Sequence, residues 1–117
     1  MDFYGIPNCD TVRKARAWLA GRGVEYRFID YKKTPPDLRT LAKWQKALGW
    51  EVVLNRKGAT WRGLPEAQRD AVTDAPSAAK LMAEFPSLIK RPVLVDGDRV
   101  LTGFSPAAYE EWFASAA

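Results

Sequence analysis

The first 31 residues predict a strand, a helix and a second strand in direct succession, and this order constrains the fold more than any other feature of the chain. Residues 2–5 predict a short strand, and apolar residues at helical spacing predict a helix over 11–22. Residues 26–31 predict the second strand, because aromatic and aliphatic side chains lie among polar ones there. A strand–helix–strand unit of this length is expected to be parallel and right-handed.

The last third of the chain predicts a hairpin followed by a helix. Residues 93–95 and 100–101 are apolar and flank the turn Asp96-Gly97-Asp98, so they are expected to pair as antiparallel strands. Ser105-Pro106 predicts the start of a terminal helix. The middle of the chain predicts mainly helices: one that has Thr34 as its N-cap and stops at Gly49, a helical turn over 52–56, an irregular stretch over 60–63, and helices over 65–72 and 76–85, the last capped by Asp74.

Together these elements predict an α/β protein with one small, four-stranded mixed sheet and helices on both of its faces. A βαβ half joined to a ββα half, with a cysteine after the first strand, is typical of a thioredoxin-like fold. A length of 117 residues favours a single domain over 1–117. We expect the thioredoxin-like core at about 1–34 and 88–117, with an inserted helical subdomain at about 35–87.

Cys9 is the only cysteine in the chain, and it lies where the first strand runs into the first helix. Unpaired backbone N–H groups and the positive end of the helix dipole favour a thiolate at that place, so the pattern predicts a reactive cysteine. Arg13 lies four residues on, one turn along the same face if the helix starts near Cys9, and its charge would lower the thiol pKa further. The alternative is a buried structural cysteine, a common fate of free thiols.

Composition excludes several kinds of site. The chain has no histidine and one cysteine, so we expect no metal site, no Cys–His nucleophile pair and no internal disulfide. No apolar run is long enough to span a membrane, and no signal sequence precedes the first strand, so we expect a cytoplasmic protein. The net charge of +4 is spread along the chain, so we expect no nucleic-acid partner. We also expect no membrane partner, and we expect a monomer.

Four segments carry a resemblance to a known family: Tyr-Gly-Ile-Pro-Asn-Cys-Asp-Thr (4–11), Leu-Asn-Arg-Lys-Gly-Ala-Thr-Trp-Arg (54–62), Ile-Lys-Arg-Pro-Val-Leu (89–94) and Gly-Phe-Ser (103–105). At these separations the chain resembles the arsenate reductase (ArsC)/Spx family, and within it the YffB-type proteins. The resemblance covers nearly the whole chain. It implies a thioredoxin-like fold with an inserted helical subdomain, and a cis peptide bond before Pro92.

The resemblance also implies roles for particular residues. Cys9 matches the nucleophile of the family's arsenate reductases, and Arg56 and Arg91 match two arginines that clamp the oxyanion. Arginine suits that role because its planar fork binds an anion through two hydrogen bonds and stays charged. In a thiol reductase of the YffB type, the same two arginines are candidates to bind the carboxylates of glutathione. Arg13 and Thr11 are candidate thiolate-stabilising residues.

Three positions depart from the family pattern. Gly103 stands where the arsenate reductases have a third arginine, and Gly5 stands where they have a histidine four residues before the nucleophile. Val12 stands where the Spx regulators have the second cysteine of their redox switch. The first two departures weigh against arsenate reduction, and the third excludes an internal disulfide switch.

Three hypotheses remain open from the sequence. The first is a glutathione-dependent thiol oxidoreductase with Cys9 as its single nucleophile, no bound cofactor, and glutathione as co-substrate. The second is an arsenate reductase coupled to glutathione and glutaredoxin. The third is a binding protein without enzymatic activity that docks on the transcription machinery, as Spx proteins do.

Overall fold

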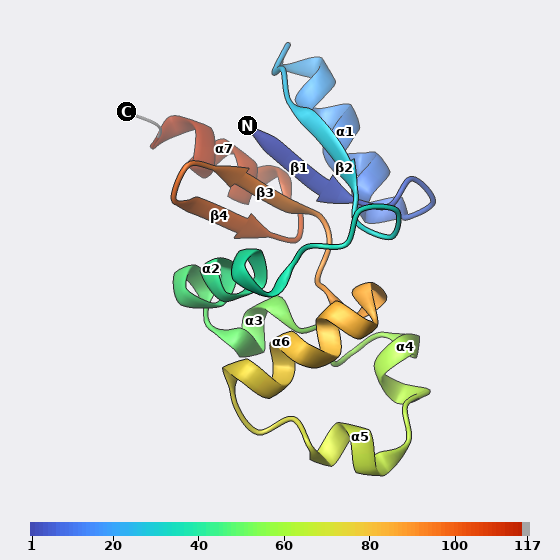
Figure 1. The fold of residues 1–117 in the computed structure, drawn as a ribbon. Helices are drawn as coiled ribbons and strands as arrows, with labels where there is room; N and C mark the ends of the chain where they lie inside the picture. The colour runs from blue at the N-terminus through green and yellow to red at the C-terminus, as the bar shows by residue number, and fades with distance from the viewer. Residues whose placement is uncertain (116–117) are drawn as a thin grey trace.

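The computed structural model describes residues 1–115, and Figure 1 shows a sheet layer above a group of short helices. The elements follow in the order β1 (Asp2–Gly5), α1 (Asp10–Gly21), β2 (Arg27–Asp30), α2 (Leu38–Leu48), α3 (Trp50–Val53), α4 (Ala59–Arg62), α5 (Glu66–Asp70), α6 (Ala75–Glu84), the 3-10 turn η1 (Pro86–Leu88), β3 (Val93–Asp96), β4 (Arg99–Thr102) and α7 (Pro106–Ala114). This order confirms the predicted α/β class, with a βαβ half and a ββα half on either side of a helical segment.

The four strands form one mixed sheet in the order β2-β1-β3-β4. β1 pairs in parallel with β2, with Phe3 opposite Phe28, and pairs antiparallel with β3, with Phe3 opposite Leu94. β3 and β4 form the predicted hairpin. Because β1 is an inner strand, Phe3 and Tyr4 are paired on both sides, and Gly5 is paired with Asp30 of β2, so the loop that follows β1 starts from a fixed position.

Helices cover both faces of the sheet, and each face has its own hydrophobic core. On one face α1 and α7 pack on the sheet through a cluster that includes Val12, Leu19, Leu94 and Tyr109. On the other face the segment between β2 and β3 packs on the sheet through a cluster that includes Leu41, Trp44, Met82, Ile89 and Val93. The ring of Trp44 meets the ring of Tyr4 edge-on, with centroids 4.8 Å apart, so α2 is seated directly on β1.

Three local expectations are wrong. Asp37, not Thr34, caps α2, since its carboxylate accepts from the backbone N–H of Thr40 at 2.8 Å. The two prolines at 35–36 explain the shift, because a residue that precedes a proline is held extended and the helix begins only beyond them. The helical turn expected over 52–56 lies earlier, at α3, and the stretch expected to be irregular over 60–63 is helical in α4.

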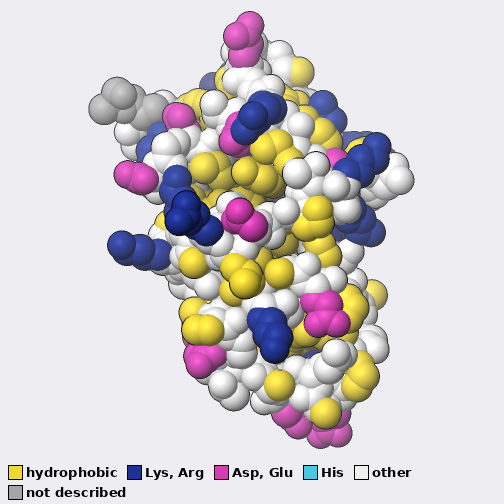
Figure 2. Space-filling view, in the orientation of Figure 1, with side chains coloured by type: hydrophobic (Ala, Val, Ile, Leu, Met, Phe, Trp, Pro, Cys, Tyr) yellow, Lys and Arg dark blue, Asp and Glu magenta, His cyan; other side chains and the backbone are white. Residues whose placement is uncertain are grey.

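No helix within residues 1–115 combines the length and the apolar character that crossing a bilayer requires. Figure 2 shows lysine, arginine and acidic side chains interspersed over the face in view. Charges of both signs therefore alternate on this face of the molecule.

Candidate functional site

Cys9 is the N-cap residue of α1. Its backbone is extended, with φ −108° and ψ 127°, and its carbonyl accepts the first helical hydrogen bond from the N–H of Arg13 at 2.9 Å. The helix thus starts at Asp10, one residue earlier than expected. The thiol is free and only partly buried, so it combines a helix N-terminus with access from solvent.

The surroundings of Cys9 favour the thiolate. Partial burial raises the thiol pKa, but the backbone N–H of Val12, the side chain of Arg91 and the backbone N–H of Thr11 together outweigh that effect and lower the pKa below its ordinary value. Within residues 1–115 the thiol itself accepts no cap hydrogen bond of standard geometry. These groups therefore act on the charged form, as nearby dipoles and a nearby cation, rather than as tight donors to the neutral thiol.

Arg91 reaches Cys9 from the segment that leads into β3. The peptide bond between Arg91 and Pro92 is cis, as the resemblance implied. The Nη1 atom of Arg91 donates to the hydroxyl of Tyr31 at 3.1 Å and to the carbonyl of Ser87 at 3.2 Å. Burial lowers the pKa of Arg91, but the interactions with Tyr31 and Cys9 raise it by more than burial lowers it. The net shift is upward, so the guanidinium stays charged near the sulfur.

The structure shows Arg13 in an ion pair with Asp10, and its expected role beside the thiol stays a prediction. Its exposed side chain pairs with Asp10 at 3.5 Å, and Arg13 is absent from the described groups that shift the pKa of Cys9. The expectation assumed that residues four apart share a helix face, a rule that holds for two helical residues. Cys9 has extended dihedrals, so its side chain does not belong to that face. Among residues 1–115, Arg91 is the basic residue that lowers the pKa of Cys9.

The other two candidates, Thr11 and Arg56, differ in their contacts. Thr11 acts on the thiol through its backbone N–H, whereas the sequence pointed to the residue as a donor without distinguishing backbone from side chain. Arg56 lies over the ring of Trp50, and its exposed guanidinium pairs with Glu51 at 3.4 Å. The loop that carries Arg56 is held beside the approach to Arg91, because the N–H of Asn55 donates to the carbonyl of Leu88 at 2.7 Å.

Tyr31 is the residue of this site that sequence reasoning missed. It is fully buried, and its hydroxyl donates to the carbonyl of Ile89 at 3.0 Å while it accepts from Arg91. A tyrosine at the end of a strand predicts a core residue, and nothing in the sequence links it to an arginine 60 positions away. Only the fold shows that partnership.

The structure shows what surrounds the three positions that depart from the family pattern. Gly5 and Val12 are in contact, since a Cβ atom on Gly5 would lie 3.0 Å from one γ-carbon of Val12. Gly103 has a positive φ of 76°, and its N–H donates to the carbonyl of Pro92 at 2.9 Å. A Cβ atom on Gly103 would meet open space, so the position beside the Arg91–Pro92 bond carries no side chain and leaves room.

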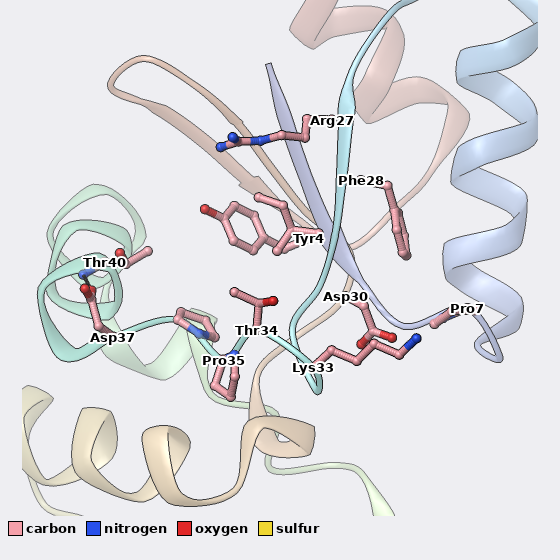
Figure 3. A pocket seen from close by; sticks show the side chains of 12 residues that line it. Tyr4, Pro7, Arg27, Phe28, Asp30, Lys33, Thr34, Pro35, Asp37 and Thr40 are labelled. Carbon is pink, nitrogen blue, oxygen red and sulfur yellow. Dashed lines mark hydrogen bonds between the residues drawn. The ribbon is translucent and has the colours of Figure 1, made fainter.

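A cavity of about 650 Å³ opens between β2 and the start of α2 (Figure 3). Charged side chains of both signs line it, among them Arg27, Asp30, Lys33 and Asp37, and Pro7 reaches it from the loop that carries the thiol. Cys9 is not among its lining residues, so the cavity is a neighbour of the site rather than part of it. Among residues 1–115 no cluster of three acidic, cysteine or histidine side chains is placed to hold a metal ion.

Comparisons with known proteins agree with this geometry. The model of the ArsC family matches residues 4–112. The solved structure of the YFFB (PA3664) protein superposes with a TM-score of 0.89 at 49% identity, covering 94% of this chain and 96% of the other. An arsenate reductase (ArsC) related protein from Brucella melitensis superposes with a TM-score of 0.75 at 49% identity, covering 96% and 92%. These neighbours confirm the thioredoxin-like fold.

The chain is also similar to a transcriptional regulator. The global transcriptional regulator Spx 1 of Lactococcus lactis is 31% identical over 109 residues, which cover 90% of this chain and 82% of the regulator. The chain is thus similar both to arsenate-reductase-related proteins and to a transcriptional regulator.

Proposed function

The chain belongs to the ArsC family, and on that premise we propose that it is a glutathione-dependent thiol oxidoreductase with Cys9 as its single nucleophile. The observation that carries the proposal is the setting of Cys9. It is a free, partly exposed thiol at the start of α1, with Arg91 beside it and a lowered pKa. A thiolate at ambient pH is what disulfide exchange requires.

The reaction has two exchange steps. The Cys9 thiolate attacks the glutathione sulfur of a glutathionylated thiol, so that a Cys9–glutathione disulfide forms and the substrate leaves as a thiolate. A second glutathione thiolate then attacks that disulfide, which releases the Cys9 thiolate and yields oxidised glutathione. The two electrons come from glutathione. The described chain offers no second thiol to resolve the intermediate, because Cys9 is its only cysteine. The protein acts as a monomer in a reducing compartment, and we place it in the cytoplasm.

Arg91 and Arg56 are the groups that bind the carboxylates of glutathione. The recorded bonds of Arg91 within residues 1–115 use Nη1 alone, and a guanidinium has five N–H donors, so Nε and Nη2 are available to an anion. Arg56 has to leave Glu51 to bind a ligand, and an exposed ion pair of this kind contributes only about 0–1 kcal/mol. The open position at Gly103 gives the tripeptide room beside Pro92.

Two other functions compete with this one. Arsenate reduction, with glutathione and glutaredoxin as reductants, is favoured by the similarity to an arsenate-reductase-related protein and by the presence of Arg91 near the thiol. The absence of side chains at Gly5 and Gly103 weighs against it. A role as a binding protein is favoured by the similarity to Spx 1, while Val12 leaves no partner for a disulfide switch.

Mass spectrometry of the intact protein separates these functions. We expect oxidised glutathione to add one glutathione to the wild-type protein, reduced glutathione to remove it, and a glutathionylated peptide to be turned over. Cys9→Ser is the matched control, and it is expected neither to form the glutathione adduct nor to turn over the peptide. Peptide turnover that persists in Cys9→Ser, or no adduct on a thiol that iodoacetamide alkylates readily, would contradict the proposal. Arsenate turnover dependent on Cys9 would establish the second function instead.

A further inference from the structure

Tyr31 joins the two halves of the fold directly behind the candidate site. It follows the last residue of β2, and its backbone N–H donates to the carbonyl of Gly5, at the end of β1, at 3.1 Å. Its side chain is fully buried in the core between the sheet and the helical segment. The backbone of Tyr31 is thereby tied to the strand that leads to Cys9, while its side chain reaches the segment that leads to Pro92.

The hydroxyl of Tyr31 makes one hydrogen bond more than its burial requires. A buried hydroxyl needs a hydrogen bond, and the carbonyl of Ile89 already provides one at 3.0 Å. The lone pairs of the same oxygen also accept from Nη1 of Arg91 at 3.1 Å. The carbonyl of Ser87 accepts from that same Nη1 atom at 3.2 Å. One nitrogen of the guanidinium thus donates to two acceptors, the buried hydroxyl of Tyr31 and the backbone carbonyl of Ser87.

Fixing one nitrogen of a planar guanidinium restricts the whole group. Arginine has several rotatable bonds and about 2 kcal/mol of rotamer entropy, so an unanchored Arg91 would spend much of its time away from the sulfur. Anchoring at Nη1 restrains the rest of the guanidinium, whose charge lies near enough to the Cys9 thiol to lower its pKa. A charge that is already oriented acts on the thiolate without further ordering.

We propose that Tyr31 is a positioning residue, whose hydroxyl holds the Arg91 guanidinium in place beside Cys9. The inference rests on the proposed function only in that Cys9 is the nucleophile. Tyr31 acts through Arg91 and does not touch the reacting sulfur. The chemistry is that of a neutral hydroxyl that accepts one hydrogen bond from a cation and donates another to a carbonyl.

The protonation of Tyr31 suits this role. Burial raises the pKa of its hydroxyl, Arg91 lowers it in part, and the charges of Cys9 and Asp30 raise it again, so the net shift is upward. The hydroxyl therefore keeps its proton over the range in which Cys9 titrates, and the anchor does not change while the thiol ionises.

The test measures the rate of Cys9 alkylation by iodoacetamide as a function of pH in wild type and variants. Tyr31→Phe removes only the hydroxyl, and it is expected to slow alkylation about three- to tenfold at pH values well below the thiol pKa, the usual worth of one hydrogen bond. The matched control is Tyr109→Phe. Tyr109 is equally buried, but its hydroxyl has no hydrogen-bond partner among the described residues, and the wild-type profile is expected to persist.

Two further variants make the test specific. In an Arg91→Met background, Tyr31→Phe is expected to have no further effect on the profile, since the hydroxyl acts through the guanidinium. Arg91→Lys keeps the charge but lacks the planar fork, so its profile is expected to lie between those of the wild type and Arg91→Met. Urea unfolding of each variant shows whether a loss of stability accompanies the change in reactivity.

A wild-type profile in folded Tyr31→Phe, or an equal slowing by Tyr31→Phe with and without Arg91, would each overturn the positioning role. These results are distinct from failure of the proposed function. That failure shows in the wild-type protein itself, as a thiol of ordinary reactivity that forms no glutathione adduct.

Discussion

The contact between Gly5 and Val12 predicts that Gly5→Ala is destabilising. The added Cβ would lie 3.0 Å and 3.2 Å from the two γ-carbons of Val12 and 3.5 Å from the ring of Phe3. Carbon atoms at rest lie about 3.5–4.0 Å apart. Val12 is fully buried, and a valine in a helix is confined to one rotamer, so it cannot turn away.

The magnitude follows from two opposing effects. Overpacking of this kind costs about 1–3 kcal/mol. Replacing glycine by alanine also restricts the unfolded chain, which returns about 0.4–1 kcal/mol. The free energy of unfolding is therefore expected to fall by roughly 0.6–2 kcal/mol, the difference between the lower ends and between the upper ends of the two ranges.

Urea unfolding followed by tryptophan fluorescence measures this change, and a second variant shows whether the contact causes it. Val12→Ala alone leaves a cavity and is expected to cost about 1–3 kcal/mol. In the double variant the new methyl group fills part of that cavity, so the loss is expected to be smaller than the sum of the two single losses. Strict additivity, or wild-type stability in Gly5→Ala, would refute the reasoning.

Two further predictions concern the basic residue that acts on Cys9 and the acidic residues that cap α2 and α6. Arg13→Ala is expected to leave the alkylation profile of Cys9 unchanged, while Arg91→Met shifts it to higher pH; the reverse ranking in the same alkylation assay would restore Arg13 as the thiol's partner. Hydrogen bonds at the starts of α2 and α6 hold the carboxyl pKa of Asp37 and Asp74 below 3.8, so their stabilisation is complete above pH 3.8 and is lost as pH falls through the lowered values. Replacing both by Asn should therefore reduce stability at neutral pH but not at strongly acid pH, as urea titrations at the two pH values will show.

The sequence predicts the place of Cys9 because the signals for it are local. A strand, a short polar loop and a periodic helix fix the helix start to within one residue, and the N-cap position follows. The partner of the thiol was not predictable in the same way. Whether Arg13 or Arg91 meets the sulfur depends on the extended dihedrals of one residue and on a tertiary contact. The bond between Arg91 and Tyr31 joins residues 60 positions apart.

The same distinction holds for the fold. The hairpin and the Asp74 cap are predictable, because turn residues and a capping box act on their own neighbours. The start of α2 was misplaced because Thr34 is a good cap by type, while the prolines that follow it delay the helix to Asp37. The four-residue helix α4 has no strong local signal, and its conformation depends on the packing around it.

The most direct test of the central claim is the apparent pKa of Cys9 in the wild-type protein, taken from the alkylation rate against pH with and without glutathione. We expect a pKa below the ordinary thiol value of about 8.5, together with protection by glutathione. A pKa at or above that value, with no protection, would make Cys9 a structural residue and would contradict its role as nucleophile.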